Sequence, residues 1–230
     1  MHIAIVLAAC AALAVADPFA LPPNFSRYAP LQNPPYKMEP CTKQPKKQCG
    51  RLEVLLDRSN EKAGKTSLAV AIYPATGPSN LFKGILFMNP GGPGGSGVDW
   101  ILGNAGDIIM DELQGSYTLI SWDPRGVGRS YPLVNCFKDG KEERSFWHST
   151  VPDAGLEARG NFTDPEDIKN FYSQEPEVDR LLKELSQRCS KLSPDFLQYV
   201  GTDAAVDDML SLKAHFSPAG HYLVNYWGFS

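Results

Sequence analysis

Three short apolar runs, each followed at once by a glycine-containing or polar loop, constrain the fold of this 230-residue chain most strongly. The runs cover residues 84–88, 117–122 and 222–227, and each is short enough for a strand buried on both faces of a sheet. Helical stripes at 98–113 and 202–216 separate them. Alternating buried strands and helices predict an α/β fold, with a mostly parallel sheet and helices on both faces.

The segments around this alternation have other patterns. Residues 17–48 contain eight prolines, which predicts an extended arm on the surface, outside any helix or central strand. Runs at 51–57 and 67–73 are separated by a polar turn and predict an antiparallel hairpin. Residues 137–200 interrupt the alternation and predict an insertion of short helices, with a helix start at Asp164-Pro165-Glu166 and an apolar stripe at Val178, Leu181, Leu182 and Leu185. The main domain is therefore expected over residues 49–230.

The charge of the chain argues against a nucleic-acid partner. The net charge is −4, and neither sign forms a long run. Nucleic-acid binding needs Lys and Arg gathered on one face. The short basic cluster of Lys43, Lys46 and Lys47 is interpreted as a solvated loop.

The first residues predict secretion. An uncharged apolar run at 3–15 is followed by Ala14-Val15-Ala16, a small-x-small site typical of signal-peptide cleavage. The run is too short to span a bilayer, and no later stretch is apolar enough, so no membrane partner is expected. Residues 1–16 are therefore expected to be a signal peptide, and the mature protein to be extracellular. Asn24 and Asn161 each begin an N-glycosylation sequon.

Four cysteines remain after removal of the leader, which suits two disulfides. A zinc site would need closer pairs such as C-x-x-C, so neither a metal nor a cofactor is expected. The sequence alone cannot choose among three connectivities. We predict Cys41–Cys49, which closes one short loop, and Cys136–Cys189, which ties together the ends of the insertion.

Three motifs follow the three expected parallel strands, where α/β sheets build their ligand crevice. The first is a glycine-rich turn at 89–97, whose exposed amides can bind an oxyanion. The second is Asp123-Pro124-Arg125-Gly126 and the residues to Ser130. The third is Gly228-Phe229-Ser230, the first half of a G-x-S-x-G nucleophile elbow.

Together with residues 199–208 and 225–230, these motifs resemble the α/β-hydrolase superfamily, and more narrowly its secreted tripeptidyl and prolyl aminopeptidase-like branch. The resemblance covers roughly residues 40–230. It implies a serine exopeptidase acting on peptides, with Ser230 as the nucleophile and an oxyanion amide at Gly91 or Gly92. It also implies that Asp123 and Arg125 brace loops and do not react.

The chain departs from the family pattern at its end. The triad order in this fold is Ser, then Asp, then His, and no residue follows Ser230. His148, His215 and His221 all precede the serine and are interpreted as surface or packing residues. We therefore expect the amino-terminal half of the fold, truncated after the nucleophile strand and inactive as it stands.

Three alternatives remain open. Residues 92–97 satisfy the dinucleotide-binding pattern G-x-G-x-x-G, although a secretion leader and the preceding hairpin argue against it. An esterase or lipase of the same fold would share the elbow, but its oxyanion turn more often reads His-Gly-Gly-Gly. A non-catalytic secreted binding glycoprotein on a hydrolase scaffold is the third.

Overall fold

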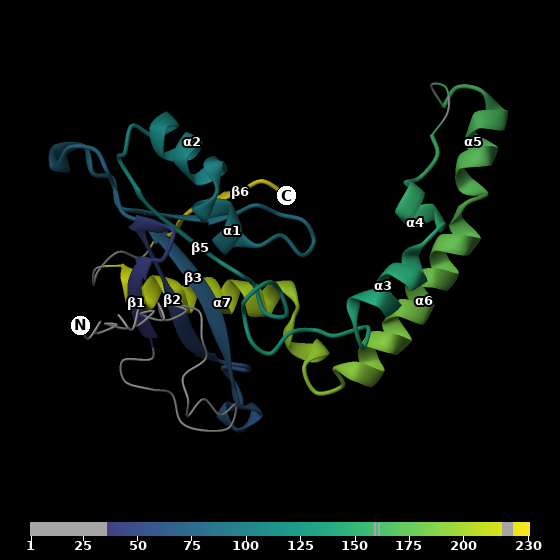
Figure 1. Cartoon of the computed structure of the whole chain (residues 1–230), viewed down its shortest axis with the longest axis horizontal. Coiled ribbons are helices and arrows are strands. Elements are labelled where there is room, and N and C mark those ends of the chain that lie inside the picture. The colour runs from purple at the N-terminus through teal and green to yellow at the C-terminus, as the bar shows by residue number, and fades with distance from the viewer. Residues whose placement is uncertain (1–35, 159, 161, 218–222) are drawn as a thin grey trace, which may run out of the picture.

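A computed structural model describes residues 36–158, 160, 162–217 and 223–230 (Figure 1). The expected signal peptide, the first part of the proline-rich arm, both sequon asparagines (Asn24 and Asn161) and His221 lie outside the described residues.

One sheet of six strands forms the body of the molecule. In chain order the strands are β1 (Tyr36–Cys41), β2 (Gln44–Leu55), β3 (Lys65–Tyr73), β4 (Ile85–Asn89), β5 (Thr118–Trp122) and β6 (Asn225–Gly228). Their order across the sheet is β1-β2-β3-β5-β4-β6. The strand β4 pairs in parallel with β5 and β6, as predicted for the three apolar runs. The pairs β1–β2, β2–β3 and β3–β5 are antiparallel. The β2–β3 pair is the hairpin that the sequence predicted, but the sheet as a whole is mixed and not mostly parallel.

One of the two extra antiparallel pairs, β1–β2, comes from the proline-rich segment, and the other is β3–β5. Residues 36–48, expected as part of an arm, form β1 and the start of β2. Proline is compatible with this position because β1 is an edge strand, and the pairing register shifts between Pro40 and Cys41. The Cys41–Cys49 disulfide links the two strands.

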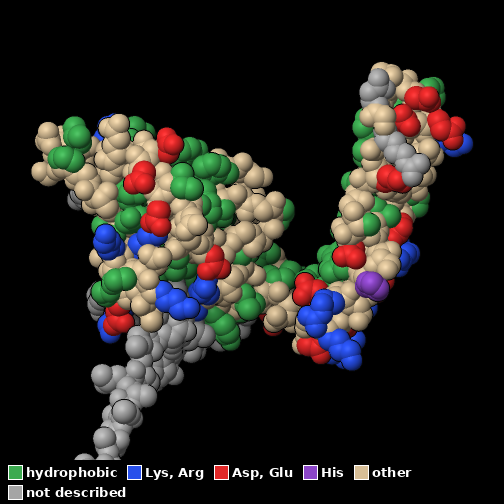
Figure 2. All heavy atoms as spheres, turned by 45° about the horizontal axis from the view of Figure 1, so that its top comes forward, with side chains coloured by type: hydrophobic (Ala, Val, Ile, Leu, Met, Phe, Trp, Pro, Cys, Tyr) green, Lys and Arg blue, Asp and Glu red, His purple; other side chains and the backbone are tan. Residues whose placement is uncertain are grey.

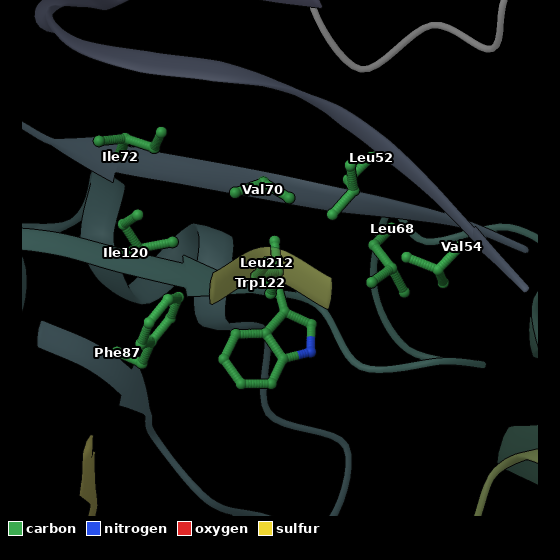
Figure 3. Close-up of a cluster of buried hydrophobic side chains, with 9 residues drawn as sticks. All are labelled: Leu52, Val54, Leu68, Val70, Ile72, Phe87, Ile120, Trp122 and Leu212. Atoms are coloured by element: carbon green, nitrogen blue, oxygen red, sulfur yellow. The ribbon is translucent and has the colours of Figure 1, made fainter. Parts of the chain in front are cut away.

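Helices cover both faces of the sheet, as predicted (Figure 1). On one face, α7 (Thr202–Phe216) inserts Leu212 into a cluster with Val70, Phe87 and Trp122 (Figure 3). On the other, α1 (Gly97–Leu102) and α2 (Asn104–Glu112) pack on the alternate side chains of the strands. The sequence predicted one helix there; the structure interrupts it at Gly103, where the backbone becomes extended and a second helix begins. Short 3-10 turns occur at Glu61–Ala63, Ser79–Leu81 and Leu197–Tyr199.

Lys47 corrects one interpretation of the sequence. It was expected in a solvated loop, but it lies on β2 and is 1% exposed. Its ammonium group bonds to Asp107 (2.8 Å) and donates to the Ile101 carbonyl (3.0 Å). It also lies 4.6 Å from the Tyr73 ring centroid. The long aliphatic stem allows the Lys47 ammonium to extend from β2 to these partners and tie β2 to α1 and α2.

The predicted insertion forms a helical arm that projects from the sheet (Figures 1 and 2). We use this name for α3 (Gly140–Trp147), α4 (Val151–Ala154), α5 (Pro165–Tyr172) and α6 (Glu175–Leu192). Asp164 caps α5 as its position before Pro165 predicts. In the part of the chain that the structure describes, no helix combines the length and apolar character needed to cross a membrane.

The arm is closed at its base. The Cys136–Cys189 disulfide joins its first and last segments, in the pairing that the sequence predicted. The Ser193 hydroxyl accepts from the Asn135 amide (2.8 Å) and donates to the Asn135 carbonyl (3.1 Å). These bonds hold the two ends of the insertion side by side.

Candidate active site

The glycine-rich turn after β4 and the serine after β6 lie in contact. Because β4 and β6 are parallel neighbours, their carboxyl ends share one edge of the sheet. The Phe229 amide donates to the Asn89 carbonyl (3.1 Å), which continues the pairing beyond β6. A Cβ atom placed on Gly91 would lie 2.4 Å from the Ser230 Cβ, so only glycine allows this approach. The fold thus brings together two of the site elements expected from the sequence.

The two glycine amides of this turn differ in their partners. Gly91 (φ 85°) and Gly92 (φ 145°) both have backbone conformations that favour glycine. The Gly91 amide donates to the Asn89 side-chain oxygen at 2.7 Å. For the Gly92 amide, no acceptor is found among the residues with described positions. Among the described residues, the Gly92 amide therefore stays available to a bound group, whereas the Gly91 amide is already engaged.

The side chain of Asp123, which follows β5 directly, holds the glycine-rich turn in place through hydrogen bonds. It is fully buried and accepts three hydrogen bonds. One oxygen accepts from the Ser96 hydroxyl (2.6 Å) and the Val98 amide (3.0 Å), and the other accepts from the Arg129 amide (2.7 Å). Ser96 in turn caps α1 through the Asp99 amide. Asp123 therefore connects the glycine-rich turn to the loop after β5, and its acceptor sites are directed at protein donors.

Arg125 has a matching structural role on the other side of the loop. Its guanidinium makes a bidentate pair with Asp208 of α7, with both bonds at 2.8 Å. It also donates to the carbonyls of Leu55 (2.8 Å) and Leu56 (2.6 Å) at the end of β2. Burial raises the pKa of the Asp208 carboxyl from its ordinary 3.8 to about 6, while the Arg125 bonds oppose that rise. The pair joins β2, the loop after β5 and α7.

Aromatic side chains flank the serine. The ring of Phe229 contacts Trp100 of α1 edge-on (4.8 Å between centroids) and stacks on Trp227 (5.1 Å). This aromatic group joins α1 to the end of β6. No local pattern of the sequence predicts this group, because Trp100 and Trp227 are far apart in the chain and the β4–β6 pairing brings them together.

The remaining candidates lie away from Ser230. His148 follows α3 in the helical arm, and the His215 ring on α7 bonds to the Ser211 carbonyl (2.9 Å). Within the described ranges, no hydrogen bond joins Ser230 to a histidine or a carboxylate. The same residues contain no group of three or more His, Cys, Asp and Glu side chains that could hold a metal ion.

The chain is similar in sequence to proteins named as serine hydrolases. The chain is 29% identical over 185 residues to serine protease Hip1 of Mycobacterium tuberculosis, covering 79% of this chain and 31% of that protein. It is 29% identical over 162 residues to carboxylesterase B of the same organism, covering 70% and 27%. It is 26% identical over 184 residues to tripeptidyl aminopeptidase of Streptomyces coelicolor, covering 80% and 30%.

The chain thus spans about a third of the length of the relatives that it matches. No protein-family model matches it. The names of the relatives support a serine hydrolase, and the mixed sheet covered by helices is compatible with an α/β fold.

Proposed function

We propose that this chain supplies the oxyanion turn and the nucleophile of a secreted serine exopeptidase with the α/β-hydrolase fold. The main support is the contact between Gly91 and Ser230 at the carboxyl ends of β4 and β6. A strand–serine turn beside a glycine-rich turn with an available amide is the arrangement that acyl transfer requires.

In the proposed reaction, the Ser230 hydroxyl oxygen attacks the carbonyl carbon of the scissile peptide bond. The negative charge that forms on the carbonyl oxygen is stabilised by the Gly92 amide, and Asp123 keeps the turn in position through Ser96. A base must take the serine proton, because a neutral hydroxyl is a poor nucleophile. The C–N bond then breaks, the base returns the proton to the leaving amine, and water hydrolyses the ester on Ser230 to free the serine. In this fold the acid and the histidine follow the serine in sequence. We therefore propose that the 230-residue polypeptide alone is inactive.

The proposed substrate is a peptide, cleaved near its amino end. The similarity to tripeptidyl aminopeptidase supports this choice, and so does the Asn89-Pro90-Gly91-Gly92-Pro93 sequence of the turn. The comparable similarity to carboxylesterase B favours an esterase as the second candidate, since the same serine and oxyanion turn can cleave an ester.

The proposed compartment is extracellular, with residues 1–16 removed and Asn161 and Asn24 glycosylated. Two disulfides suit an oxidising compartment. Amino-terminal sequencing of the secreted protein should begin at Asp17, and glycosidase treatment should reduce its mass. Retention of Met1 in the cytosol would contradict the proposal.

A fluorophosphonate probe, which labels activated serines, tests the catalytic proposal. We expect no labelling of the 230-residue chain. A longer product of the same gene should be labelled, and Ser230→Ala should abolish that labelling, while Ser190→Ala, an exposed site on α6, should not. The longer product should release fluorophore from tripeptide amides with a free amino terminus. Labelling that survives Ser230→Ala would refute the nucleophile assignment, and cleavage of esters alone would favour the esterase.

A further inference from the structure

The outer end of the helical arm contains a pocket of about 410 Å³, bounded by α5, α6 and the segment after α4. Its apolar walls are the side chains of Leu156, Phe171, Tyr172, Val178 and Leu182. Leu156, Tyr172 and Leu182 are each more than half exposed. Large apolar side chains gathered around one exposed hollow are typical of an interaction site.

The pocket is held in shape by specific contacts. The Gln174 side chain accepts from the Glu157 amide (2.8 Å) and donates to the Glu157 carbonyl (2.9 Å). These two bonds fix the segment after α4 to the junction of α5 and α6. Phe162 packs edge-on against Phe171, with ring centroids 5.3 Å apart. Several contacts between α5, α6 and the segment after α4 therefore keep the shape of the pocket.

The charged groups that line this pocket are both acidic. They are Glu175 and Asp179, and both are exposed. Asp179 bonds to Lys183 one turn later (2.7 Å), an exposed pair that contributes little energy. The acidic character extends around the tip, since residues 153–182 contain eight Asp and Glu against three Lys and Arg. A pocket with apolar walls and acidic side chains at its border is complementary, in polarity and in charge, to an apolar side chain with Lys or Arg on either side.

We propose that this pocket docks a basic segment of a polypeptide, with one apolar side chain in the hollow and Lys or Arg beside Glu175 and Asp179. A second copy of the chain fits less well, because its tip carries the same negative charge. An anionic lipid surface would also be repelled.

If the chain has the proposed function, the polypeptide bound at the tip is the substrate itself. The arm stands on the same side of the sheet as the C-terminus, where Ser230 lies, with open space between arm and body (Figures 1 and 2). A polypeptide long enough to cross this space would extend from the tip to the proposed catalytic edge. The substrate class is therefore a polypeptide with a basic, apolar-anchored segment away from the cleaved bond.

Binding to the 230-residue chain tests the pocket without any catalytic step. The probe is a fluorescein-labelled peptide with a central Leu-Phe flanked by lysines, followed by fluorescence anisotropy at low salt. Two control peptides replace either the lysines with glutamates or Leu-Phe with Ala-Ala. We expect binding of the first peptide, weakening with added salt, and little binding of either control.

Variants with matched controls locate the site. Leu182→Ser removes one apolar wall of the pocket and should weaken peptide binding about tenfold, as expected for the loss of one buried apolar contact. Glu175→Gln with Asp179→Asn should weaken it about fivefold. Ile108→Ser, at a 61% exposed apolar position on α2, and Asp111→Asn should bind like the unmodified chain. All these positions are exposed, and circular dichroism checks that each variant is folded.

Equal affinity for the lysine and glutamate peptides, or unchanged affinity in the Leu182 and acidic-pair variants, would overturn the proposal. Self-association that Leu182→Ser abolishes, measured by sedimentation, would assign the pocket to a second copy instead. Because no turnover is measured, failure of fluorophosphonate labelling in the longer product would refute only the proposed catalysis. Loss of peptide binding would refute only the pocket.

Discussion

Replacing Asp123 with Asn tests how strongly the loop after β5 holds the glycine-rich turn. The unmodified side chain accepts three bonds in a fully buried place, from Ser96, Val98 and Arg129. An amide has one oxygen, so in the better orientation it keeps two of these bonds without their charge. The NH2 group of the asparagine then faces the Arg129 amide, and because both groups are donors, no hydrogen bond forms between them.

The magnitude follows from these bonds. Hydrogen bonds to a charged acceptor contribute roughly 1.5–3 kcal/mol each, neutral ones roughly 0.5–1.5, and a buried donor without an acceptor costs roughly 1–3. Loss of charge on two bonds and loss of the third therefore lower the free energy of unfolding by about 4 kcal/mol. With a urea dependence of about 2.5 kcal/mol per molar, the midpoint of unfolding falls by about 1.5 M.

Urea titration followed by circular dichroism measures this shift, with Asp99→Asn as the matched control. Asp99 belongs to the same cluster but is exposed, where it pairs with Arg129 (2.6 Å), so its change should cost less than about 1 kcal/mol. A midpoint for Asp123→Asn close to that of Asp99→Asn would show that the buried acceptor does not hold the turn, and would refute the reasoning.

Three further outcomes are expected. Replacing Cys136 and Cys189 together with Ser should lower the unfolding free energy by about 4 kcal/mol in the chain-entropy model, measured as a urea midpoint shift, because the bond closes a separation of 53 residues. Gly91→Ala places a Cβ 2.4 Å from the Ser230 Cβ and should reduce the hydrolysis rate of the longer product at least a hundredfold by displacing the oxyanion turn. For Asp208, a folded-state pKa of about 6 against an ordinary 3.8 means that the folded chain binds a proton which the unfolded chain releases. Stability from this group therefore increases as the pH falls from about 6 to 4, and Asp208→Asn should remove that component from urea titrations at several pH values.

The sequence predicted the central strands and the meeting of two loop segments at their carboxyl ends. Buried strands with glycine turns at their ends have strong local signals, and parallel pairing of β4 with β5 and β6 then places 89–97 beside Ser230. The Asp123 and Arg125 bonds also confirm the structural role expected for that loop.

Other features depend on tertiary contacts that no local pattern reveals. The prolines of residues 36–48 concealed β1, since an edge strand tolerates proline when only one side of it is paired. Lys47 appeared to belong to a solvated cluster, yet Asp107, sixty residues later, makes its burial possible. The choice between the Gly91 and Gly92 amides required knowledge of where the Asn89 side chain points.

The closed base of the arm has a consequence for how this protein can evolve. The chain leaves the body near Asn135 and returns near Ser193, and these points are bonded to each other. The residues between Asn135 and Ser193 can therefore lengthen, shorten or change in sequence while these two points stay the same distance apart. Selection can therefore modify the acidic, apolar tip independently of the strands that position Ser230, so the two regions can diverge at separate rates.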